Sequence, residues 1–238
     1  SQIRKHEKVN AISLGMAGNG PLIEFATLKE YAIKKNPKNI LWFYFERNDL
    51  ADLKIEKTSS IIMKYLKNNF NQNLISNQKK IDKDLRKYIK LAEEEKNIKN
   101  KKNYPTFAEA INKIIRLQIV RDKTSLDRGF KVKIDPLFKK ILFKVKELVD
   151  QNNINLYFIY LPDKERYSSN KMNDEKYLRR SEVIDIINNL NITLIDIHKQ
   201  FFIKQEDPLN FYAQRIYGHY SAEGYNKIAK IIIENIKK

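Results

Sequence analysis

Three short apolar runs, each set between helical patterns, constrain the fold of this chain more than any other feature. They read NILWFYF at residues 39–45, NLYFIYL at 155–161 and ITLIDI at 192–197. Apolar runs without polar alternation are typical of parallel strands covered on both faces. Alternating strands and helices of this kind predict a parallel sheet between two helical layers. We therefore expect an α/β fold with three αβα layers.

A fourth strand is predicted at Val9–Leu14. The run VNAISL is followed by the glycine-rich stretch from Gly15 to Gly20, and Pro21 then begins a helical pattern. Proline is favoured at the first position of a helix, so this order predicts a strand, a loop and a helix.

The stretch between the second and third apolar runs predicts a helical insertion. Leu53 to about Asn103 is charged, lacks glycine and has a helical pattern, and a further helix is expected at Phe107–Val120 after Pro105. Its apolar faces are too intermittent for a core of its own. We therefore expect a single domain over residues 1–238, with a helical insertion at about 53–135.

Composition excludes several classes of protein. The chain has no Cys, which rules out disulfides, cysteine-ligated zinc and a thiol nucleophile, and its three His residues leave little for a metal cluster. We expect no metal and no cofactor. No apolar run approaches the roughly 20 residues of a membrane span, and no signal peptide opens the chain. The sequence does not decide whether the protein lies in the cytoplasm or at the cell envelope.

The net charge of +17 invites a nucleic-acid interpretation. The excess is mostly Lys, in a background rich in Asn and Ile, and Arg, the usual bidentate reader of phosphate, is sparse. A basic nucleic-acid-binding domain is therefore the weakest of the alternatives, and no specific nucleic acid is expected as a partner.

Three residues with catalytic chemistry fall at the expected carboxyl edge of the sheet, where ligands of open parallel sheets bind. Gly18 lies in a loop whose backbone N–H groups can face an anion, or which is only a tight turn. Asn48 can donate to an oxyanion or serve as a helix N-cap. His219 precedes the last helix and can act as a general base or be a surface residue.

The motifs around these residues resemble the SGNH (GDSL-like) hydrolase family. SLGMAGNGP at 13–21 is similar to the second family block, FERND at 45–49 to the third, and GHYSAEGY at 218–225 to the last. The resemblance implies a flavodoxin-like topology, with the Gly18 N–H and the Asn48 side chain as oxyanion donors. It also implies that His219 is the base that activates a serine.

The first family block, Gly-Asp-Ser, is absent from the 238 residues. Either the first strand and the nucleophile lie upstream of Ser1, or the chain is a pseudoenzyme. In the family this strand is central, so its loss would expose strand edges. We expect a closed-up sheet of four strands or a strand supplied by another chain.

Two further positions depart from the family pattern. Ile216 occupies the usual place of the triad acid, so Asp207, or less favourably Glu206, is the candidate acid. Arg47 replaces a family glycine and either contacts an anionic substrate or blocks the cleft. Asp163, at the end of a predicted strand, is a further candidate for substrate contact. His198 could pair with Asp196, but a structural role is favoured.

The expected function is that of an SGNH-type serine esterase or acyltransferase. Its substrate would be an O-acyl ester of a carbohydrate or lipid, and the nucleophile would come from the parent protein. The alternative is a non-catalytic SGNH-like module that binds a glycan or a protein. The sequence leaves the oligomeric state open.

Overall fold

The computed structural model describes residues 2–7, 10–100, 134–168, 175–216 and 218–237. The chain divides into two compact units, one formed by residues 1–71 with 131–238 and the other by 72–130. The first unit holds the sheet and all the candidate residues.

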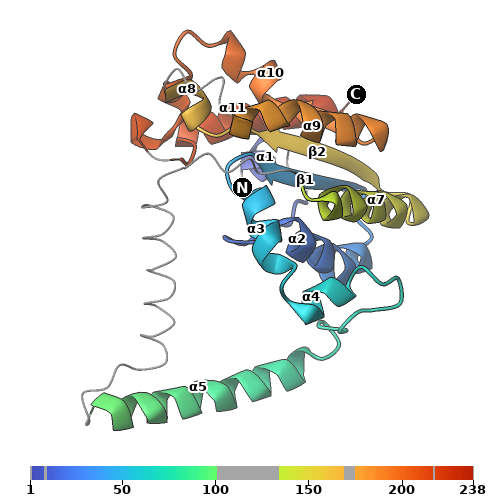
Figure 1. Cartoon of the computed structure of the whole chain (residues 1–238), viewed down its shortest axis with the longest axis vertical. Coiled ribbons are helices and arrows are strands. Elements are labelled where there is room, and N and C mark those ends of the chain that lie inside the picture. Colours follow the sequence, from blue (N-terminus) through green and yellow to red (C-terminus); the bar gives the residue numbers. More distant parts are fainter. Residues whose placement is uncertain (1, 8–9, 101–133, 169–174, 217, 238) are drawn as a thin grey trace. The chain divides into compact units, whose positions relative to one another are not determined.

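The sheet of the first unit has three parallel strands in the order β1 (Asn39–Phe45), β2 (Asn155–Leu161) and β3 (Thr193–Asp196) (Figure 1). Asn39 pairs with Asn155, Phe45 pairs with Leu161, and Tyr157 pairs with Thr193. The predicted α/β class and parallel sheet are confirmed at these three apolar runs.

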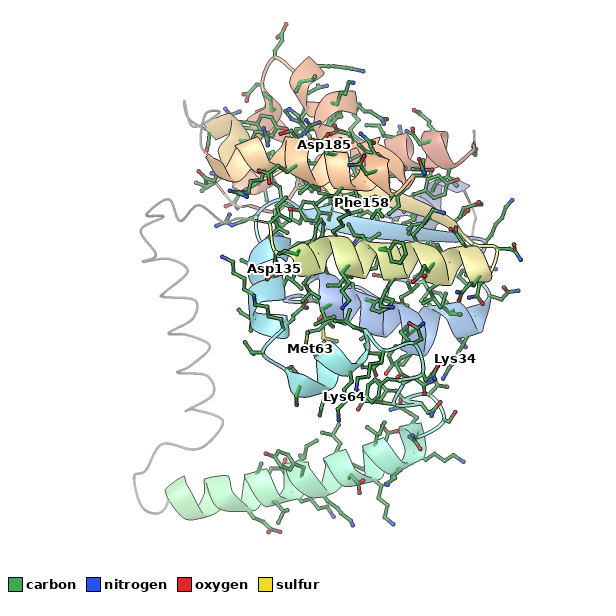
Figure 2. All side chains as sticks on the ribbon, turned by 45° about the vertical axis from the view of Figure 1, so that its right-hand side comes forward. Lys34, Met63, Lys64, Asp135, Phe158 and Asp185 are labelled. Atoms are coloured by element: carbon green, nitrogen blue, oxygen red, sulfur yellow. The ribbon has the colours of Figure 1, made fainter. Side chains whose placement is uncertain are left out.

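Helices cover both faces of the sheet. One face carries α2 (Pro21–Thr27), α7 (Pro136–Gln151) and α9 (Glu175–Asn189), whose buried side chains share a core with Trp42, Tyr44 and Phe158. Figure 2 shows Phe158 in this interior, while Asp185 of α9 is exposed. The other face packs Ile159 and Ile195 against α11 (Ala222–Ile236), and α1 (Gln2–Glu7) packs on α11. The arrangement is therefore three-layered.

Local chemistry sets the helix boundaries. Pro136 occupies the first position of α7, and Asp135 caps that helix by accepting from the Leu137 N–H at 2.9 Å. Ser221 caps α11 through the Gly224 N–H. A π-helical turn (Leu28–Ala32) and a 3-10 turn (Ile33–Lys35) extend α2 to Asn36, whose φ of 45° ends the helix before β1.

Short helices make the remaining connections. They are α3 (Asp49–Glu56), α4 (Ser60–Lys64), α8 (Glu165–Ser168), α10 (Ile197–Gln200) and the 3-10 turns Phe202–Lys204, Pro208–Phe211 and Ala213–Arg215. In the second unit, α5 (Gln78–Asn100) exposes large apolar side chains, among them Tyr88 and Leu91.

The strand predicted at Val9–Leu14 is wrong over the residues that the structure describes. Residues 10–14 form no strand, and Ile12 is 70% exposed. The run is short, and its apolar side chains alternate with small or polar ones, so it lacks the continuous apolar character that buries β1 and β2. The closed sheet of four strands is also wrong, because the described sheet has three strands.

The predicted insertion begins earlier than the second unit. Leu53 and Tyr65 are buried in the core of the first unit, whereas the second unit begins at residue 72. The helix expected at Phe107–Val120 lies outside the described residues.

Phe138 is fully buried on α7, against the Tyr44 ring at 5.7 Å between centroids. Replacing it by Ala should lower the free energy of unfolding by about 3–5 kcal/mol, because a cavity is left beside the sheet. Urea denaturation measures this change. Phe143→Ala is the matched control, since Phe143 lies on the same helix and is 50% exposed; equal losses in the two variants would contradict the described core.

Candidate functional site

The carboxyl end of β1 is tied to the segment that follows β2 by the buried side chain of Glu46. This carboxylate accepts from the Tyr160 hydroxyl at 2.6 Å and from the Asp163 N–H at 3.1 Å, and it forms an ion pair with Arg166 of α8. Burial and the Glu46 charge raise the pKa of Tyr160, so its hydroxyl stays protonated as a donor. The strand-end loops are therefore fixed by charge-assisted hydrogen bonds.

The glycine-rich loop is held from inside the protein by Glu56 of α3. Its carboxylate accepts from the N–H groups of Gly20 at 2.6 Å and Leu22 at 2.9 Å. A Cβ at Gly20 would lie 2.8 Å from the Asp52 Cβ, so only glycine fits there. The anion that this loop binds in the structure is thus an internal carboxylate.

Gly18 lies at the exposed tip of the same loop. Its φ of 83° is in the left-handed region that favours glycine, and the turn is closed by the Asn19 N–H donating to the Met16 carbonyl at 3.2 Å. The turn interpretation of Gly18 is therefore supported by its backbone, and its exposure keeps it accessible to a ligand.

Asn48 stands at the N-cap position of α3 but does not cap the helix with its side chain. Its Nδ2 instead donates to the Asp52 carboxylate at 2.5 Å. A side-chain amide carries two N–H donors, and the bond to Asp52 uses one of them. Asp52 also lies beside Gly20, so the residue that holds the Asn48 amide is next to the end of the glycine loop.

His219 precedes α11 with an exposed side chain, and no hydrogen bond joins its ring to another described residue. Its backbone is well anchored: the carbonyl accepts from the Ala213 N–H at 2.8 Å. The neighbouring Tyr220 is buried and donates to the Pro162 carbonyl at 2.6 Å, as Tyr212 does at 3.0 Å. The His219 loop is therefore fixed against the end of β2.

Arg47 joins the loop after β1 to the same region. Its Nη1 lies 3.9 Å from the Asp163 carboxylate, and a Cβ at Gly218 would be only 2.7 Å from that nitrogen. Gly218 thus leaves room for the guanidinium, which is half-exposed. Arg47 and Asn48 are adjacent in sequence, as are Gly218 and His219, so the two predicted motifs meet.

Two predicted roles do not fit the observed contacts. Asp163 is fully buried and is engaged by neighbouring groups, so in this conformation it does not meet a ligand directly. Asp207 pairs with Arg215 at 2.5 Å and caps the turn that begins at Pro208. Among the described residues no carboxylate is hydrogen-bonded to His219, so the predicted orienting acid is not seen beside its ring.

A second polar network lies at the end of β3. The sequence analysis considered only two of its members, His198 and Asp196. Asp196 pairs with Arg180 of α9 and caps α10 through the Lys199 N–H, so it does not pair with His198. The Nδ1 of His198 lies 2.6 Å from the Tyr167 hydroxyl. Burial, with the charges of Arg166 and Arg180, lowers the pKa of His198 to about 3. A neutral, structural histidine fits these contacts.

A group of carboxyl side chains beneath the glycine loop was not predicted from the sequence. Asp49 is buried and accepts from the Phe45 N–H at 3.0 Å, and Glu24 places a buried oxygen near it without a hydrogen bond to any described residue. Burial, and next the Asp49 charge, raises the pKa of Glu24; burial also raises the pKa of Asp49. The helical spacing of Asp49, Asp52 and Glu56 is the sequence pattern that could have indicated this group of carboxyl side chains.

These carboxyl groups do not form a metal site over the part of the chain that the structure describes. No described helix is long and apolar enough to cross a membrane. Comparison with protein-family models, with curated proteins and with solved structures found no match.

The raised pKa of Glu24 makes stability depend on pH. Folding is favoured by its protonated form, so this contribution is complete below the unfolded pKa of about 4.5 and is lost as pH rises through the higher folded pKa. Glu24→Gln should therefore flatten the fall of the free energy of unfolding as the pH rises above about 4.5. Glu147→Gln, at an exposed position on α7, is the control, and its stability should vary with pH as that of the unsubstituted chain does. The same pH dependence in Glu24→Gln would contradict the raised pKa of Glu24.

Proposed function

We propose that this chain forms the oxyanion-binding and general-base part of an SGNH-type serine esterase or acyltransferase. The supporting observation is that the end of the glycine loop at Gly20 and the loop before α11 at Gly218 each lie beside the segment that follows β1. They are joined to it through the Gly20–Asp52–Asn48 contacts in the first case and the Arg47–Gly218 contact in the second. The β1–β2–β3 order is compatible with the proposed topology, which requires further strands beyond β1.

The proposed chemistry is acyl transfer from an O-acyl ester of a carbohydrate or lipid. His219 takes the proton of a serine hydroxyl as its oxygen bonds to the ester carbonyl carbon, and the carbonyl oxygen becomes an oxyanion held by the Gly18 N–H and the Asn48 Nδ2. Collapse breaks the bond to the alcohol, which receives the proton from His219. Water or a second alcohol then accepts the acyl group by the reverse steps.

The proposal takes the serine from a Gly-Asp-Ser block elsewhere in the parent protein. Within the described residues, Ser221 is committed to capping α11 and Ser13 lies in an exposed segment outside any strand. The half-exposed guanidinium of Arg47 would stand beside the oxyanion donors. It would favour a substrate that carries negative charge or many hydroxyl groups.

A non-catalytic SGNH-like module is the second candidate. Two observations favour it: the Asn48 amide is already engaged by Asp52, and no described carboxylate is hydrogen-bonded to the exposed His219 ring. In this alternative, Arg47 and His219 would contact a glycan or protein partner without bond cleavage.

Hydrolysis of p-nitrophenyl acetate by the full parent protein tests the esterase proposal. His219→Ala should lower kcat by roughly 10²–10⁴, and Asn48→Ala by roughly 10²–10³, because a base and an oxyanion donor are lost. Asn152→Ala, at an exposed helix end, is the matched control and should keep full activity.

Labelling of the same protein by a fluorophosphonate probe separates the two candidates. Labelling that is lost in His219→Ala supports the enzyme. Turnover that is unchanged in His219→Ala would rule out the proposed site, and a parent protein without turnover or labelling would favour the binding module.

A further inference from the structure

The long helix α5 of the second unit, green in Figure 1, presents large apolar side chains to solvent. Four of them are between 46% and 62% exposed, namely Leu85, Tyr88, Ile89 and Leu91. Contiguous apolar surface on a protein in water commonly marks a place where a partner or a membrane binds. This helix is therefore a candidate binding surface.

The exposed apolar side chains gather on one face of the helix. Five apolar residues of the segment 85–92 share this face, namely Leu85, Tyr88, Ile89, Leu91 and Ala92. At about 100° per residue they fall within an arc of roughly 160°, and no charged residue of the segment lies inside that arc. The seam of a coiled coil is narrower. The face therefore suits a flat apolar surface better than a single partner helix.

The opposite face of the same segment is basic. Three exposed cations fill the remaining arc, namely Arg86, Lys87 and Lys90. Three more extend the basic face toward the start of α5, namely Lys79, Lys80 and Lys83. The acidic residues of α5 lie outside the segment 85–92, at positions 82, 84 and 93–95. The segment thus combines an apolar face with a positively charged one.

We propose that α5 binds in the plane of an anionic lipid bilayer, with its apolar face among the acyl chains and its cations at the level of the lipid phosphates. Charge complementarity selects this occupant, because helices with one basic face and one apolar face bind such surfaces. Tyr88 fits the boundary between acyl chains and headgroups, where tyrosine rings are favoured. No described helix is apolar enough to cross a membrane, which is consistent with a helix that lies on the surface.

The six cations of the basic face act together on the lipid phosphates. A helix with its side chains is about 10–12 Å across, and the Debye length is about 8 Å at physiological ionic strength. Cations on the flanks and on the far side of α5 are therefore all attracted by an anionic surface. The net charge of +17 on the whole chain adds attraction at longer range. Binding should consequently weaken as salt is added.

A second copy of α5 fits the apolar face less well than a bilayer does. The apolar stretch from residue 85 to residue 92 is only about 10 Å long. Two such stretches would bury far less than the roughly 1,600 Å² of a standard protein interface. Each copy would also bring the same positively charged surface to the pair.

The fluorescence of a Trp placed on the apolar face tests the proposal. The chain has one Trp, Trp42, which is 5% exposed, so Tyr88→Trp adds a second Trp at a surface position. Vesicles of phosphatidylglycerol and phosphatidylcholine in equal parts should shift the emission of Tyr88→Trp to shorter wavelength, because residue 88 leaves water. The unsubstituted chain is the control, and its emission should stay unchanged.

Sedimentation with the same vesicles measures binding and identifies the residues responsible. The apolar pair Leu85→Gln with Tyr88→Gln and the basic pair Arg86→Gln with Lys90→Gln should each lower the partition coefficient about tenfold or more. Vesicles of phosphatidylcholine alone should bind the unsubstituted chain about tenfold more weakly or less.

Exposed positions on α7 supply the matched controls. Phe143→Gln is the control for the apolar pair, and Lys139→Gln with Lys140→Gln is the control for the basic pair. Both should bind the vesicles as the unsubstituted chain does.

Binding that requires anionic lipid, is lost in both α5 pairs and is kept in the α7 controls supports the proposal. Equal binding to the two kinds of vesicle, or equal binding by the α5 variants and their controls, would overturn it. Emission of Tyr88→Trp that lies at short wavelength without vesicles and does not change with them would also overturn it. In that case another part of the chain or a second copy covers the apolar face.

Discussion

The buried carboxylate of Glu46 is the interaction on which the carboxyl edge of the sheet depends. A charge with about 7% of its residue surface exposed is tolerated only when donors surround it, and here they come from β2, from the segment after β2 and from α8. The segments after β1 and β2 are thereby fixed to each other. Removing one partner would leave an uncompensated buried charge, so the network acts as a unit.

The candidate site is built on this fixed edge by two separate attachments. Tyr212 and Tyr220 fasten the His219 loop to the Pro162 carbonyl, next to the segment that Glu46 binds. Glu56 of α3 holds the end of the glycine loop and the start of α2 through the N–H groups of Gly20 and Leu22. Asn48 and Arg47 lie between these attachments. The loops are therefore held in place by buried residues that take no part in the proposed chemistry.

The sequence predicted the sheet well because its strands are chemically distinctive. NILWFYF and NLYFIYL are apolar on both faces, and the helices between them have proline starts and regular apolar faces. The prediction was wrong at VNAISL, because a short apolar run forms a strand only if a neighbour offers its edge. That condition depends on tertiary pairing, which local pattern does not contain.

The loops that follow the strands could be located from the sequence, but the contacts they make could not. The residues at strand ends identified the edge, since carboxyl ends of parallel strands lie together. The partners of these residues were not predictable: Asn48 with Asp52, Asp207 with Arg215, and Glu56 with the glycine loop join residues whose proximity exists only in the folded chain. The resemblance to the SGNH family stays a prediction, because the comparisons found no relative that could test it.

The meeting of the loop after β1 with the loop before α11 at one edge is the feature on which the proposed site rests, and cross-linking measures it most directly. The chain has no native Cys, so a variant with Arg47→Cys and Gly218→Cys has no background reaction. With a short bismaleimide spacer, we predict rapid intramolecular cross-linking in buffer that is lost in urea. Cross-linking no faster than in a variant with Arg47→Cys and Glu147→Cys would contradict this arrangement.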